Sequence, residues 1–212
     1  MIDASMVNHK NMKSLNNYSN SKRSNILEIA AELFLEKGFS GASTSELVRR
    51  IGGSKTTIYS HFGNKAGLFT AVVDEILKEA VTFSDSLDLS KSSTRDALIE
   101  IADQHLKIIL SERYVKLIRI VAAEVYRFPE IGKAFYDHGP GTSYSNFQKY
   151  LDQKVADGEL NIADTARATD LFFGTLLHRE VLSRIYGVKN TRLHNRAAIA
   201  KAVTDQFLEH YS

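Results

Sequence analysis

A short polar stretch that follows two consecutive glycines carries residue types suited to recognising nucleic acid. Ser54 comes directly after Gly53 and can cap a new helix. Ile58 and Phe62 lie about one helical turn apart, so such a helix would bury both and expose its remaining side chains. The hydrogen-bonding residues on that outer face are Lys55, Thr56, Thr57, Tyr59, Ser60 and His61. Lysine, hydroxyl and imidazole groups can bond to base edges and phosphate oxygens, so the stretch predicts a helix that contacts DNA.

This stretch is open to two other interpretations. A short polar helix after two glycines is also typical of a solvated connector, and the pattern alone leaves that alternative open. The run Gly52–Thr56 superficially resembles a phosphate-binding loop, but Ser54 rather than glycine precedes Lys55. No buried strand leads into the run either, so the sequence argues against a nucleotide site here.

Catalytic and metal-binding patterns are absent from the sequence. The run His178-Arg-Glu180 does not have the H-E-x-x-H spacing, and no G-x-S-x-G motif occurs. Two further neighbouring acid–histidine pairs, Asp103 with His105 and Asp137 with His138, come without a third ligand. We therefore expect no enzyme activity, no cofactor and no metal.

The elements around the polar helix are predicted to be helices as well. Apolar residues recur at helical spacing from about Ser21, and Gly38 is expected to stop that first helix. Ser43 and Glu46 have the spacing of a capping box, which predicts a second helix that ends before Gly52. A connecting helix is predicted over residues 65–82. Together these segments predict a helix-turn-helix domain over residues 21–66.

The remainder of the chain is predicted to be all-α. The linker Leu87–Ser93 is the expected domain boundary, and residues 94–212 would form a second helical domain. Its expected helices are Thr94–Leu110, Arg113–Phe128, Glu130–Asp137, Thr142–Asp157, Asp164–Tyr186 and Arg192–His210. Residues 1–20 are rich in Asn and Ser without an apolar period, and we expect them to form a mobile basic arm.

Composition narrows the possible classes of protein. The 212 residues include no cysteine, which removes disulfides, thiolate zinc sites and cysteine nucleophiles, and favours a reducing setting. No apolar run reaches the ~18 residues that span a bilayer, and the first twenty residues have no secretory-signal core. The net charge is +2, but residues 1–66 hold nine Lys/Arg against five Asp/Glu. This basic first third indicates a polyanionic partner.

The motifs around the polar helix resemble the TetR/AcrR family of bacterial one-component regulators. The matching segments are Ile26–Phe39, Ser43–Leu47, Gly53–Lys65 and Leu68-Phe69. The family signature reads turn-Ser-Lys-x-x-hydrophobic-Tyr-x-x-Phe-x-x-Lys-x-x-Leu, and this chain fits it throughout. Val48 stands where alanine is commoner, and Gly53 where an apolar residue is usual. The segments Val121–Glu130 and Phe135–Pro140 resemble the AefR-like branch of the family.

The resemblance implies specific DNA-contacting residues. The expected set is Ser43, Thr44, Ser45, Arg49, Lys55, Thr56, Thr57, Tyr59, Ser60, His61 and Lys65. Within it, Lys65 and the hydroxyl residues at the start of the second helix would hold phosphates, with Arg49 or Arg50 nearby. Lys10, Lys13, Lys22 and Arg23 could add contacts from the arm, although loose basic tails are common.

For the second domain, the resemblance implies a small-molecule cavity and a dimer face. Candidate cavity residues are His105, Ile108, Arg119, Ala122, Tyr126, Phe147, Phe173 and Leu177. Candidate dimer residues, on the last two helices, are Phe172, Gly174, Leu182, Ile199, Val203 and Phe207. Each of these could equally be an ordinary core or surface residue.

These expectations combine into one functional hypothesis. The chain is expected to be a homodimeric repressor of the bacterial cytoplasm that binds a palindromic double-stranded operator. An apolar or amphipathic small-molecule effector would release it, and no membrane partner is expected. The alternative is a helix-turn-helix adaptor or activator without small-molecule control.

Overall fold

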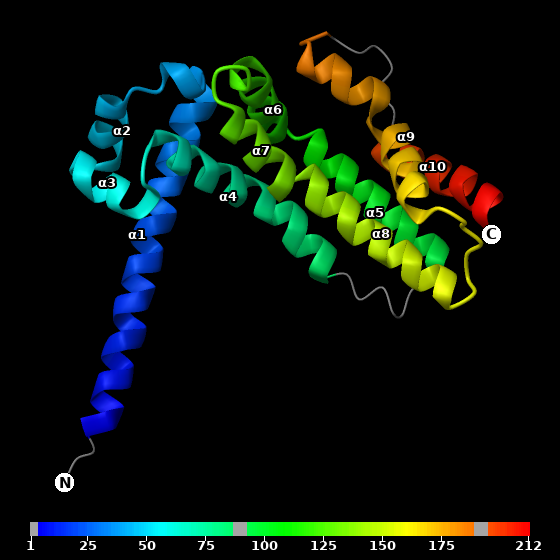
Figure 1. The fold of residues 1–212 in the computed structure, drawn as a ribbon, viewed down its shortest axis with the longest axis horizontal. Helices are drawn as coiled ribbons and strands as arrows, with labels where there is room; N and C mark the ends of the chain where they lie inside the picture. Colours follow the sequence, from blue (N-terminus) through cyan, green and yellow to red (C-terminus); the bar gives the residue numbers. More distant parts are fainter. Residues whose placement is uncertain (1–3, 87–92, 189–194) are drawn as a thin grey trace. The chain divides into compact units, whose positions relative to one another are not determined.

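The computed structural model describes residues 4–86, 93–188 and 195–212, and every element in these ranges is a helix (Figure 1). The helices are α1 (Ala4–Gly41), α2 (Thr44–Ile51), α3 (Lys55–Phe62), α4 (Lys65–Ser86), α5 (Thr94–Ile109), α6 (Glu112–Glu124), α7 (Pro129–His138), α8 (Pro140–Ala156), α9 (Thr165–Ile185) and α10 (Arg196–Tyr211). The predicted all-α class is therefore confirmed. Within the described ranges, no helix is long and apolar enough to span a bilayer.

The chain divides into two compact units, Met1–Val72 and Val73–Ser212. The division falls inside α4, earlier than the predicted boundary at residues 87–93, most of which lie outside the described residues. The second half of α4 joins unit 2 through its side chains. His138 Nδ1 lies 3.2 Å from Asp74 Oδ1, and a Cβ on Gly139 would lie 3.0 Å from Leu77 Cδ1.

The first unit is built from α1, α2, α3 and the first turns of α4. Gly38 inside α1 has φ 74° and ψ 174°, a conformation that interrupts the helix as its position in the sequence predicted. Phe39 can then fold back, and its ring lies 6.0 Å from that of Phe34 and 5.2 Å from that of Phe69. This aromatic cluster and the buried Leu47 are part of the core of unit 1.

The start of α1 differs from the sequence prediction. Backbone from Ala4 onward is helical, whereas an arm was expected over residues 1–20. Residues 4–25 contain neither proline nor glycine, so nothing in the chain stops the helix from continuing toward the N-terminus.

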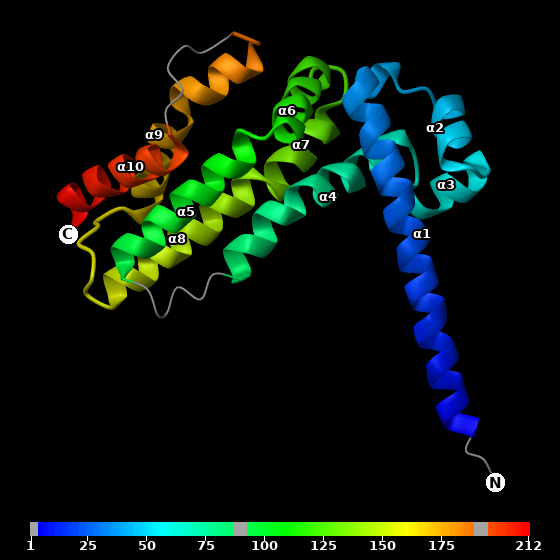
Figure 2. The ribbon, with the colours of Figure 1, turned by 180° about the vertical axis from the view of Figure 1, so that it is seen from behind.

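The second unit is a bundle in which α10 packs along α5 (Figure 2). Two ion pairs join these helices: Arg95 Nη2 lies 2.6 Å from Asp205 Oδ1, and Arg196 Nε lies 2.6 Å from Asp103 Oδ1. Buried apolar side chains from α5 to α10 fill the interior, among them Leu106, which is fully buried. Burial of this surface is the main source of the bundle's stability.

Candidate nucleic-acid interface

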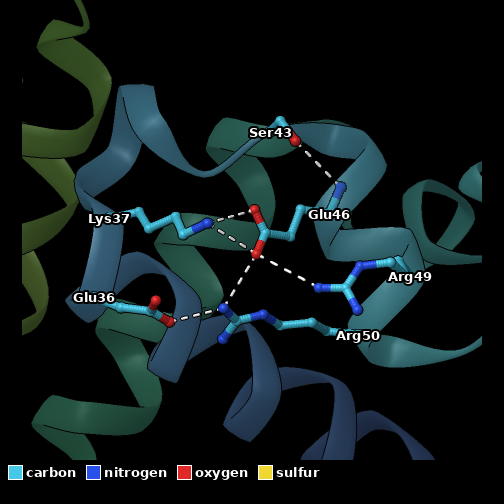
Figure 3. A network of polar contacts seen from close by, with 6 residues as sticks. All are labelled: Glu36, Lys37, Ser43, Glu46, Arg49 and Arg50. Carbon is cyan, nitrogen blue, oxygen red and sulfur yellow. Dashed lines mark hydrogen bonds and ion pairs between the residues drawn. The ribbon is translucent and has the colours of Figure 1, made fainter.

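A network of charged side chains fixes α2 against α1 (Figure 3). Ser43 caps α2, its Oγ accepting from the backbone N–H of Glu46 at 3.2 Å. Lys37 Nζ, on α1, donates to both carboxylate oxygens of Glu46 at 2.8 and 3.0 Å. Arg50 Nη2 lies 3.1 Å from Glu46 Oε1 and 2.8 Å from Glu36 Oε2. Hydrogen bonds from Lys37 and then Arg50 lower the pKa of the Glu46 carboxyl below its usual value.

The network distinguishes the two adjacent arginines of α2. The Arg50 side chain is 27% exposed and is held between two carboxylates. The Arg49 side chain is 73% exposed, and its Nη2 lies 3.7 Å from Glu46 Oε1 (Figure 3). Of the two, Arg49 therefore presents the guanidinium group that can reach a phosphate from this helix.

The polar helix α3 has the two faces that the sequence predicted. Its apolar face holds Ile58 and Phe62, which are buried. Ser54 caps the helix by accepting from Thr57 N at 3.0 Å, and its Oγ lies 2.9 Å from Thr57 Oγ1. The exposed members of the predicted set are Lys55, Thr56, Thr57, Ser60 and His61. The guanidinium carbon of Arg23 lies 5.5 Å from the Phe62 ring centroid, which brings a cation from α1 to the end of α3.

Two predicted DNA-contacting residues also position the elements of unit 1. The Tyr59 hydroxyl lies 3.0 Å from Thr44 Oγ1, so this half-buried side chain joins α3 to the first turn of α2. Lys65 Nζ lies 4.8 Å from the Phe39 ring centroid and donates to the Ser40 carbonyl at 3.4 Å. The Tyr59 hydroxyl is thereby held against α2, and the Lys65 ammonium group is held against the end of α1.

The arrangement in unit 1 suits recognition of a polyanion. The Tyr59–Thr44 bond brings the N-terminal turn of α2, with exposed Ser43 and Ser45, next to α3. Backbone N–H groups at such helix starts attract phosphate. Within the described residues, no group of three or more His, Asp or Glu side chains is placed to hold a metal ion.

Unit 2 brings together part of the predicted cavity set. The ring of His105 on α5 lies 4.4 Å from that of Phe173 on α9, and the ring of Phe147 on α8 lies 5.1 Å from it. Ile108 is half-buried on α5, one turn after His105. The sequence prediction missed Tyr144, whose ring stacks on Phe173 at 4.8 Å. Its position one helical turn before Phe147 was the signal in the sequence that could have placed both rings on the same face of the helix.

The remaining members of the cavity set lie elsewhere. Ala122 is exposed and the Tyr126 side chain is 95% exposed, so neither lines an interior space in this chain. Arg119 donates through Nε to the Ile185 carbonyl at 2.7 Å and through Nη2 to the Arg184 carbonyl, and so caps the end of α9. The side chain of Leu177 lies outside the described residues.

The predicted dimer residues differ in exposure. Phe172, Val203 and Phe207 are buried between α9 and α10, and they line a groove of about 160 Å³. Ile199 is half-buried. Gly174 is exposed, with open space where a Cβ would lie, and Leu182 is 44% exposed.

Comparison with known proteins identifies the family. Residues 26–72 match the model of the bacterial regulatory proteins of the tetR family, and residues 96–212 match the C-terminal domain of AefR-like transcriptional repressors. The chain is 30% identical over 149 residues to the HTH-type transcriptional repressor AcnR of Corynebacterium efficiens, covering 69% of each chain.

Solved structures agree with this assignment. A TetR-family transcriptional regulator from Mesorhizobium loti superposes with a TM-score of 0.80 at 26% identity, covering 92% of this chain and 98% of that one. The flavonoid-responsive regulator FrrA superposes with a TM-score of 0.77 at 25% identity, covering 91% and 98%. The chain belongs to the TetR family of transcriptional regulators. It is a DNA-binding regulator with an N-terminal helix-turn-helix and an AefR-like C-terminal domain.

Proposed function

We propose that this regulator is a homodimeric repressor that binds a palindromic operator through α3 and leaves it when a small molecule binds unit 2. The observation that carries the DNA-binding part is the polar outer face of α3, supported from below by the buried Ile58 and Phe62. Repression is supported by the similarity to AcnR, which is a transcriptional repressor, and to the C-terminal domain of AefR-like transcriptional repressors. Control by a small molecule is supported by FrrA, which is described as flavonoid-responsive.

The residues of unit 1 divide into two roles in this proposal. Lys55 can donate to guanine acceptors, and the methyl groups of Thr56 and Thr57 can contact thymine, so these residues read sequence. Arg49 and the α2 N-terminus bind phosphates, which positions the domain without selecting sequence. Two α3 helices must then lie ~34–36 Å apart to enter successive major grooves.

The proposed dimer uses the outer face of α9. Leu171 is 53% exposed and Leu182 is 44% exposed, an arrangement that a second copy would cover. Gly174 lies between them without a side chain, which permits close approach of a partner helix. Leu182→Glu is expected to shift the protein toward monomer in sedimentation velocity. Tyr126→Glu, which changes an exposed residue of another region, should leave the sedimentation coefficient unchanged.

Release requires that the effector bind one arrangement of the protein better than the other. A shift from 1:99 to 99:1 needs a differential binding free energy of ~5.5 kcal/mol. The helix α4 belongs to both units and is the covalent connection through which a change in unit 2 can alter the separation of the two α3 helices.

The decisive experiment selects bound duplexes from a random pool with the full-length protein, then measures affinity for the recovered sequence against salt. We expect a palindromic motif and a steep fall in affinity as salt rises. Lys55→Ala should then lose discrimination at one base pair, at ~1–3 kcal/mol for the lost contact. If no duplex is retained at low ionic strength, the proposal is wrong.

A further inference from the structure

Phe173 is the centre of a stack of rings contributed by three helices of unit 2. The ring of Tyr144 lies parallel to it at 4.8 Å, with an interplanar angle of 2°. His105 lies on it at 4.4 Å with a tilt of 48°, and Phe147 meets it edge-on at 5.1 Å. Phe173 and Phe147 are buried, whereas Tyr144 and His105 are half-buried and keep surface on which a further ring can stack in the arrangements that aromatic rings prefer.

His105 brings an unpartnered polar atom to this apolar stack. The residue keeps some exposed surface, but its Nε2 atom is buried and has no hydrogen-bond partner within the part of the chain that the structure describes. Burial lowers the pKa of the imidazole to about 4, so it is neutral near pH 7. A buried polar atom without a partner costs free energy, and a ligand that supplies the partner recovers it.

The two tyrosines near the stack are also uncharged near pH 7. Burial raises the pKa of Tyr114 to about 12, with a smaller contribution from the neighbouring Tyr144. Burial also raises the pKa of Tyr144, and the nearby Asp170 carboxylate raises it further. Arg119, the cation that the sequence placed in this set, is bonded to the end carbonyls of α9. An anionic ligand at the stack would therefore lose its hydration and lie near the negatively charged Asp170 carboxylate.

We propose that the ring stack around Phe173 binds an uncharged, planar aromatic molecule whose hydroxyl group forms a hydrogen bond with Nε2 of His105. This inference rests on the proposed function, because the bound molecule would be the effector that releases the operator. Stacking supplies most of the affinity, and the His105 bond selects molecules with a polar group at one edge.

Three naphthalene compounds of the same ring shape test the proposal on the full-length protein. 2-Naphthol is neutral at neutral pH and carries a hydroxyl, naphthalene lacks any polar group, and 2-naphthoate is an anion. Their dissociation constants can be measured from ligand or protein fluorescence. We expect 2-naphthol to bind about threefold to tenfold more tightly than naphthalene, the gain typical of one hydrogen bond, and 2-naphthoate to bind most weakly.

Two variants assign the preference to His105. His105→Phe keeps a ring in the stack and removes the unpartnered nitrogen, so it should fold with an undiminished Tm. It should bind 2-naphthol and naphthalene with equal dissociation constants. The matched control His210→Phe replaces an exposed imidazole of α10 and should keep the parental preference for 2-naphthol.

Several results would overturn the site. These are no binding of 2-naphthol up to its solubility limit, tighter binding of 2-naphthoate, or a parental preference retained in His105→Phe. The proposed function fails separately, through an operator selection that recovers no duplex. If 2-naphthol binds as expected but leaves operator affinity unchanged, the site stands and its role in release is refuted.

Discussion

The adjacent arginines of α2 are expected to respond oppositely to substitution. Arg49→Ala removes an exposed guanidinium that can reach a phosphate, whereas Arg50→Ala removes a cation bonded to Glu36 and Glu46. Each phosphate contact adds ~0.9 to the slope of log affinity against log salt. A fourfold rise in salt, from about 50 to about 200 mM, therefore weakens a protein with one more contact by an additional factor of about 3.5. The affinity advantage of the parent over Arg49→Ala should shrink by that factor across the range.

Two measurements separate these roles. Fluorescence anisotropy with the selected duplex at several salt concentrations gives the slope, and urea unfolding gives the stability of unit 1. Arg49→Ala should lower the slope and keep the parental urea midpoint. Arg50→Ala should lower the midpoint, because Glu36 and Glu46 lose a shared partner, and should keep the parental slope at salt concentrations where it is folded. The reverse pattern would show that the charge network in unit 1 has been misassigned.

Three further predictions concern the stability of unit 1. A Cβ on Gly67 would lie 2.0 Å from the Phe62 carbonyl oxygen, so Gly67→Ala should cost ~1–3 kcal/mol in urea unfolding through forced backbone movement. Gly53→Ala adds a methyl group into open space and is the matched control, and equal losses in both variants would contradict the argument. Tyr59→Phe removes the hydroxyl bond to α2 and should cost ~0.5–1.5 kcal/mol, measured by the same unfolding; no change would mean that the bond adds nothing to stability. The pKa of Glu46 is lowered in the folded state from its ordinary value of 4.5, so its stabilising contribution is present above that value and is lost as the pH falls through the folded pKa. The unfolding midpoint of Glu46→Gln should therefore fall less between neutral and acidic pH than that of the parent. An equal fall in both proteins would show that ionised Glu46 does not stabilise the fold.

The local features of unit 1 could be predicted from the sequence because short-range forces determine them. Ser43 and Ser54 each cap a helix through a bond to the backbone three residues on. Gly38 and Gly52 stop helices because both adopt positive φ, a conformation that side chains disfavour. The same reasoning placed Ile58 on the buried face of α3.

Other features depend on partners that are distant in the sequence and could not be predicted. Arg49 and Arg50 look equivalent in sequence, and only the packing of α1 on α2 provides Glu36 to one of them. Arg119 was assigned to a cavity, but it caps a helix that ends 66 residues later. The division of the chain inside α4 likewise reflects contacts between residues distant in the sequence, such as that of Asp74 with His138 on α7.

The shared helix α4 sets a rule for engineering hybrid regulators. A fusion that replaces this chain up to Ser86 with the DNA-binding half of another protein would remove Asp74 and Leu77. His138 and Gly139 would then face side chains of the other protein. A junction between Val72 and Val73 keeps these native neighbours in one parent, while requiring only that the splice preserve helical phase. An exchangeable C-terminal unit of this protein therefore begins in the middle of a helix.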